Sequence, residues 1–124
     1  MEDARLQRLT AICAELPEAE RVLALPHAQF RVRKRTFAYF LDDHHGDGIV
    51  AVTCKAPGGQ PEPLIAADDE GRFYLPSYLG PRGWIALRLD RETVDWTEVA
   101  DLVTDSYLQV APKRLAALII DSPG

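Results

Sequence analysis

Four of the five residues from 31 to 35 carry a positive charge, namely Arg31, Arg33, Lys34 and Arg35. Such side chains could bind phosphate, because a guanidinium group hydrogen-bonds phosphate oxygens in pairs. We predict that this stretch forms a strand and a turn, where the four side chains cannot all be buried. The alternative is that the first two form the solvated face of an antiparallel sheet and the last two an ordinary exposed turn.

Lys113 and Arg114 form a second basic group, in the first turn predicted for the last helix. Cations at this place oppose the positive end of the helix dipole. They invite an anion, and the N–H groups of the helix start would help to bind phosphate or carboxylate. The alternative is that both side chains pair with surface acids such as Asp101 and Asp105.

Trp84 and Arg88 lie in another predicted strand, on the face opposite to its apolar residues. If the predicted strands share one sheet, arginines and aromatic rings, Phe40 included, converge on its outer face. Proteins use this combination to stack bases and to hold backbone phosphates. We therefore predict a nucleic-acid-binding or anion-binding site made of these basic and aromatic residues: Arg31, Arg33, Lys34, Arg35, Trp84, Arg88, Lys113 and Arg114.

The sequence offers little for catalysis or for metal binding. The segment from Asp42 to Gly48 is rich in Asp and His, but it lacks the glutamate that closes a calcium loop, and its adjacent histidines suit a single zinc ion poorly. We interpret it as a polar loop. No spacing singles out Cys54, Ser77 or Ser106 as a nucleophile, and Gly58-Gly59 lacks a nucleotide-loop pattern. We favour a non-enzymatic protein without a cofactor, catalytic residues or a metal site.

Length and composition indicate one globular domain, which we assign to residues 1–124. Apolar residues make up 47% and charged residues 27% of the chain, as in average soluble proteins. The net charge is −5, so any nucleic-acid site must be a local patch. Apolar runs are too short for a membrane span, and the acidic start is unlike a secretory signal. Cys13 and Cys54 form no Cys-x-x-Cys pair, which favours reduced thiols and a cytoplasmic protein.

Hydrophobic periodicity predicts the elements that position these residues. Residues 3–16 have the stripe of an amphipathic helix, capped by Asp3 and ended by Pro17. Alternating residues over 29–41 predict a hairpin in which Lys34 and Arg35 form the loop. In this register Val32 faces Phe37 and Phe30 faces Tyr39 on one side of the sheet.

Further strands are predicted over residues 49–55, 72–75 and 83–90, with a short helix over 62–69 between the first two. Asp95-Trp96-Thr97-Glu98 fits a capping box, in which Glu98 reaches back to the helix start. Pro112 begins one more helix. Helix, antiparallel strands and helices in this order predict an α+β fold whose helices cover one face of a sheet.

Three segments resemble the MmcQ/YjbR family, and the resemblance extends from about Leu6 to Leu118. They are Phe30-x-Val32-x-x-x-x-Phe37-Ala38, then Gly83-Trp84-Ile85-x-Leu87-x-Leu89-Asp90, then Ser106-Tyr107-x-x-Val110-Ala111-Pro112-Lys113-Arg114-Leu115. The resemblance implies a two-layer α+β domain of the YjbR and CyaY-like (frataxin-like) type. It supplies no catalytic residues.

Proteins of this family are commonly described as DNA-binding, with a double-wing mode. The resemblance therefore implies a binding module for DNA. The basic residues of an acidic chain predict that such binding is weak and falls steeply with salt. Two alternatives stay open. One is a domain that binds an acidic protein or a small anion. The other is a metal-binding protein like frataxin, for which only Glu15, Glu18 and Glu20 offer a sparse set of acids.

Overall fold

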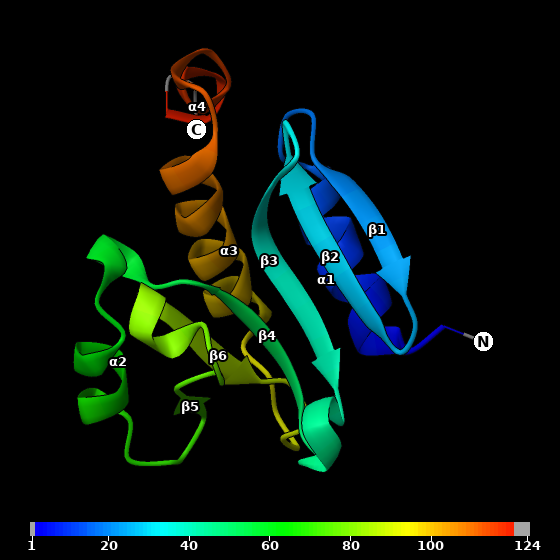
Figure 1. Ribbon diagram of the computed structural model, residues 1–124, viewed down its shortest axis with the longest axis vertical. Coiled ribbons are helices and arrows are strands. Elements are labelled where there is room, and N and C mark those ends of the chain that lie inside the picture. Colours follow the sequence, from blue (N-terminus) through cyan, green and yellow to red (C-terminus); the bar gives the residue numbers. More distant parts are fainter. Residues whose placement is uncertain (1, 121–124) are drawn as a thin grey trace.

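A six-stranded antiparallel sheet with the strand order β1-β2-β3-β4-β6-β5 forms the centre of the fold (Figure 1). The computed structural model describes residues 2–120, apart from the side chain of residue 45. The strands are β1 (Glu20–Ala24), β2 (His27–Val32), β3 (Arg35–Asp42), β4 (Val50–Lys55), β5 (Phe73–Tyr74) and β6 (Trp84–Arg88). The fold is α+β, as the order of predicted elements indicated.

Two helices, α1 (Ala4–Ala14) and α3 (Trp96–Val110), cover one face of this sheet (Figure 1). The buried side chains of the sheet that point toward them include Phe30, Phe40, Val52 and Ile85, each at most 1% exposed. Two shorter helices, α2 (Glu62–Ala67) and α4 (Lys113–Ile120), lie at the margins of the fold. Among residues 2–120, neither α1 nor α3 nor any other α-helix covers the opposite face of the sheet, which is called the open face below.

The β2–β3 hairpin differs from the prediction by one residue. Its turn is Arg33 and Lys34, both with positive φ (49° and 66°), and Arg35 already begins β3. Positive φ at both central residues is the turn geometry that matches the twist of a hairpin. Arg35 therefore pairs with Val32 on β2.

A bulge near the start of β3 also changes the predicted facing of the hairpin. The register shifts between Phe30 and Arg31, so that Phe30 pairs with Ala38 and not with Tyr39. Phe37 and Ala38 are consecutive and both buried, because the extra residue of a bulge interrupts the strict alternation of faces. Tyr39 consequently lies on the open face, where it pairs with Gln29.

The remaining predicted elements form close to their predicted ends, and the structure adds one strand. Strand β1 is an edge strand whose residues are mostly exposed, so it lacks the alternation by which strands are predicted. In β6, Ile85 and Leu87 face the helices while Trp84 and Arg88 face the other way, as predicted. The loop between β3 and β4 contains a short 3-10 helix, His44–Gly46. The side chain of His45 in this helix lies outside the described residues.

Both predicted helix caps form, and one predicted contact does not. Asp3 accepts a hydrogen bond from the N–H of Arg5, and Asp95 accepts from Thr97 and Glu98. The prediction that Glu98 reaches back to its own helix start is wrong. Its carboxylate instead pairs with Arg72 at 2.6 Å, because that guanidinium group lies beside the first turn of α3.

Candidate functional site

The two basic segments of the sequence meet at one end of the fold. Glu18 joins them. Its carboxylate accepts a hydrogen bond of 2.7 Å from Arg33 in the hairpin turn, and it lies 3.8 Å from the guanidinium group of Arg114 at the start of α4. The hydrogen bond from Arg33 holds the pKa of Glu18 below its ordinary value, so this carboxylate stays ionised. We call this region the basic end, made of five residues: Arg33, Lys34, Arg35, Lys113 and Arg114.

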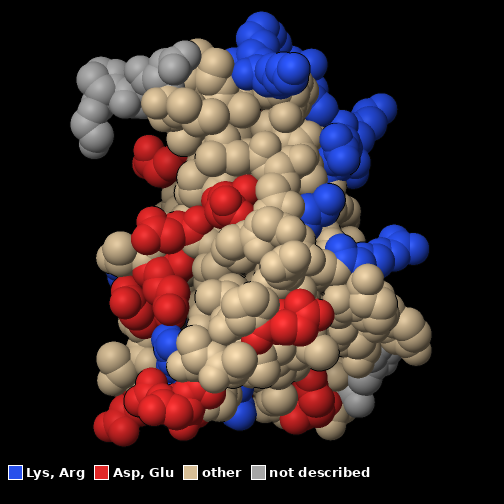
Figure 2. Space-filling model, turned by 90° about the vertical axis from the view of Figure 1, so that its left-hand side faces the viewer, with Lys and Arg blue, Asp and Glu red and all other residues tan. Residues whose placement is uncertain are grey.

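Arg35 makes a second link between the hairpin and the end of α3, because its guanidinium donates to the carbonyl oxygen of Val110 at 3.2 Å. The side chains of Lys34 and Lys113 are exposed and make no hydrogen bond or ion pair with any residue from 2 to 120. Figure 2 shows Lys and Arg gathered at the top and along the right edge, whereas Asp and Glu gather over the left and the lower part. The chain is acidic as a whole, yet on this face its charges are separated between two regions.

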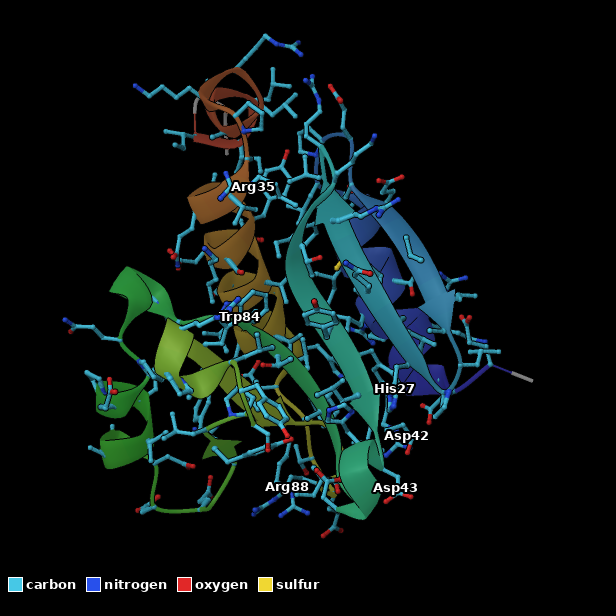
Figure 3. All side chains as sticks on the ribbon, viewed as in Figure 1. His27, Arg35, Asp42, Asp43, Trp84 and Arg88 are labelled. Carbon is cyan, nitrogen blue, oxygen red and sulfur yellow. The ribbon has the colours of Figure 1, made fainter. Side chains whose placement is uncertain are left out.

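Arg31 and Arg88 share the open face but lie far from each other. In the strand register, Arg31 is the partner of Thr36 at the start of β3. Arg88 is the partner of Ala51 on β4, which in turn is the partner of Leu41 near the end of β3. Strand rise and strand spacing place their backbones about 20 Å apart. Figure 3 shows Arg88 at the lower end of the sheet, opposite to Arg35.

Both of these arginines also form ion pairs with acidic neighbours. Arg31 binds Glu20 at 2.7 Å, and Arg88 binds Asp90 at 2.9 Å. The hydrogen bond from Arg88 lowers the pKa of Asp90, so the second pair stays charged. One continuous basic surface that includes Arg31, Arg88 and Lys113 does not form.

Trp84 faces the open side of the sheet, as predicted, but its indole is buried. The residue is only 6% exposed, and its ring packs at 5.8 Å from the ring of Tyr39 (Figure 3 labels Trp84 in mid-sheet). A buried ring offers no face to an incoming base, so Trp84 acts in packing. The exposed indole expected from the sequence is therefore absent.

The open face contains a hollow of about 460 Å³ that the sequence did not indicate. Strands β1 to β4 line it together with Tyr74 and the segment 76–79, which lies over the sheet. Its lining residues come from separate elements and include His27, Gln29, Tyr39 and Thr53. No short motif connects them, so only the alternation of residues on β2 and β3 could have grouped some of them in advance.

The acidic and histidine-rich loop gives no metal site among the residues that the structure describes, since no group of three or more His, Cys, Asp or Glu side chains there could hold an ion. Asp43 and Asp47 instead accept backbone N–H groups of their own loop, from Gly48 at 2.7 Å and from Ile49 at 2.9 Å. Cys54 is buried, and burial raises the pKa of its thiol to about 12. A thiol that stays protonated is a poor nucleophile.

The fold and these surfaces define a small α+β protein with one helix-covered and one open sheet face. Within the described residues 2–120, no helix is long and apolar enough to cross a membrane. Two crystal structures are similar to the chain. The Deinococcus radiodurans protein DR2400, described with a DUF419 domain, has a TM-score of 0.68 at 22% identity, over 95% of this chain and 88% of its own. A Pseudomonas syringae protein has a TM-score of 0.65 at 17% identity, over 88% of this chain and 100% of its own.

The YjbR family model matches residues 14–109, and the chain belongs to this family. The family that the Gly-Trp and Ser-Tyr segments predicted is thereby confirmed. No curated protein matches the chain.

Proposed function

We propose that residues 1–124 form a non-enzymatic binding module that takes the phosphate groups of DNA at the basic end. The supporting observation is that Glu18 joins Arg33 of the hairpin turn to Arg114 of α4, which brings two distant basic segments together. Glu18 pairs with only two of the five cations, Arg33 and Arg114, so the basic end keeps a surplus of positive charge. Two free buried thiols, Cys13 and Cys54, support a cytoplasmic location.

The charge pattern also limits the affinity. Phosphate binding releases the counterions of DNA, and affinity then falls steeply with salt. The net charge of −5 opposes the approach of a polyanion, so we expect weak binding. Arg31, Arg88 and Trp84 add little in this proposal, because the first two are paired with acids and the third is buried.

The test measures binding of a short labelled DNA duplex by fluorescence anisotropy, with salt raised from about 50 to about 200 mM. We expect the double variant Lys34→Ala and Lys113→Ala to lower the slope of log affinity against log salt by roughly 1 to 2. A matched control removes two exposed arginines elsewhere, Arg8 and Arg91, and should leave the slope nearly unchanged.

Two outcomes speak against DNA as the ligand. Absence of binding at the lowest salt would remove the proposal. Equal binding of a polyglutamate peptide would mean that the basic end recognises negative charge alone, and it would favour an acidic protein or a small anion as the partner.

A further inference from the structure

The hollow on the open face has the size of a small-molecule site. Its volume of about 460 Å³ lies within the range in which proteins bind cofactors and metabolites. It is separate from the basic end, whose five residues are all absent from its lining. The sheet forms its floor, where strand pairing holds the backbone, and the segment 76–79 forms one wall.

Several aromatic side chains are among those that a ligand in the hollow would meet. His27, Tyr39, Tyr74 and Tyr78 all line the hollow. The ring of Tyr39 packs beside the buried ring of Trp84, with the two centroids 5.8 Å apart. Aromatic rings pack best against other rings, in stacked or edge-on geometry. The lining is therefore suited to a flat ring.

Several polar atoms in the hollow have unused hydrogen-bonding capacity. The Nδ1 atom of His27 accepts the N–H of Asp42 at 3.2 Å, so the proton of the neutral ring lies on Nε2. That N–H has no partner within the described residues, and the same holds for the hydroxyls of Tyr39 and Tyr74. Gln29 donates through its amide nitrogen to Thr36, which leaves its carbonyl oxygen as an acceptor. Figure 3 shows His27 beside Asp42 at the end of the hairpin.

The charge of the lining excludes an anionic ligand. Among the described residues that line the hollow there is no Lys or Arg, whereas the carboxylate of Asp47 is present. Arg88, which lies near Tyr74, is neutralised by Asp90 at 2.9 Å. A phosphate or carboxylate group placed here would lose its water and find no cation.

We propose that this hollow binds a small, flat aromatic or heteroaromatic compound that carries no negative charge. Its ring packs against Tyr39, and the polar groups at its edge bond to Nε2 of His27 and to the carbonyl oxygen of Gln29. This ligand chemistry is the opposite of that proposed for the basic end. The two sites can therefore succeed or fail independently.

The test uses one ring system in three charge states: indole, tryptamine and indole-3-acetate. Binding is followed by amide chemical shifts in two-dimensional NMR of the full chain. We expect indole and tryptamine to move the amides of Gln29, Tyr39 and Thr53, and indole-3-acetate to bind about tenfold more weakly or not at all. Variant Tyr39→Leu should weaken indole binding about tenfold, whereas Lys34→Ala should leave it unchanged.

A control variant, Trp96→Leu, removes a half-buried ring outside the hollow and should keep indole affinity. Because Tyr39→Leu could also perturb the fold, Gln29→Ala provides a second variant that leaves the rings intact, and it should weaken a probe with a polar edge such as indole. Three results would overturn the proposal: no shifts in the hollow, strongest binding of indole-3-acetate, or shifts at these amides caused by raising the protein concentration alone.

Discussion

The hydroxyl of Ser106 on α3 donates a hydrogen bond to the carbonyl oxygen of Phe37 on β3, over 2.6 Å. The same hydroxyl accepts the N–H of Lys55 on β4 at 3.0 Å. Ala38 and Cys54 form the last pair of the β3–β4 ladder, so Phe37 and Lys55 are next in register. The serine side chain therefore bridges β3 and β4 where a direct backbone hydrogen bond between them would follow, and it connects α3 to both strands.

We predict that Ser106→Ala lowers the free energy of unfolding by about 1 to 3 kcal/mol, because it leaves a buried carbonyl oxygen and a half-buried N–H without a partner. Urea denaturation followed by circular dichroism measures this. The exposed Ser77→Ala is the control and should change the stability by less than about 0.5 kcal/mol. Equal stability of the two variants would contradict the bridging role of Ser106.

Gly83 precedes the buried Trp84 and lies against the backbone of another loop. A Cβ atom at this position would meet the carbonyl oxygen of Gly59 at 2.7 Å, and the residue has a φ of +87°. We predict that Gly83→Ala costs about 2 to 4 kcal/mol, from backbone strain and overpacking together. Gly46→Ala is a matched control, since Gly46 has a φ of +73° and no atom nearby. It should cost only about 1 kcal/mol, and an equal loss in thermal or urea unfolding would show that the contact with Gly59 does not matter.

The parts of the fold that could be predicted from the sequence are those with a regular period. The stripe of α1, the alternation of β6 and the cap at Asp95 all depend on neighbours in the sequence. The bulge at Phe37 could not be predicted, because nothing in the local sequence marks it, whereas in the structure the carbonyl oxygen of Phe37 is held by Ser106 of α3, far along the chain. Strand β1 was missed because an exposed edge strand needs no alternation of apolar residues.

The candidate sites show the same division. The basic end could be predicted in part, because each of its two segments is dense in positive charge. That the two segments meet at Glu18 depends on the tertiary structure. The exposure of Trp84 could not be predicted. Alternation along the strand shows to which side of the sheet the indole points, but it does not show which residues cover the indole there. The hollow required the register of β2 and β3 and the path of residues 76–79, and neither has a local signal.

Both cysteines should be protected from reagents while the chain is folded. Cys13 and Cys54 are at most 2% exposed, and burial raises the pKa of both thiols. We predict that a thiol reagent at pH 8 modifies the native protein far more slowly than the protein in urea, because reaction needs opening of the core. Modification of native protein as fast as a free thiol peptide would contradict the packing of this core.

Tyr74 should make stability sensitive to alkaline pH. Burial, with a smaller contribution from the carboxylates of Asp47 and Asp90, raises the pKa of its hydroxyl to about 12. In the unfolded chain the pKa of tyrosine is about 10. The folded state therefore favours the protonated phenol, and the resulting stabilisation is complete below about pH 10 and is lost as the pH rises through 12.

We predict that wild type loses about 1 kcal/mol more stability than Tyr74→Phe between about pH 9 and pH 12, after allowance for solvent screening of this half-buried group. Urea unfolding at a series of pH values measures the difference, and absorbance of tyrosinate follows the titration directly. Tyr78→Phe, at an 81% exposed position, is the control and should follow wild type. Parallel stability curves for wild type and Tyr74→Phe would show that the phenol of Tyr74 titrates as freely as in the unfolded chain, and that the hollow around it is open to water.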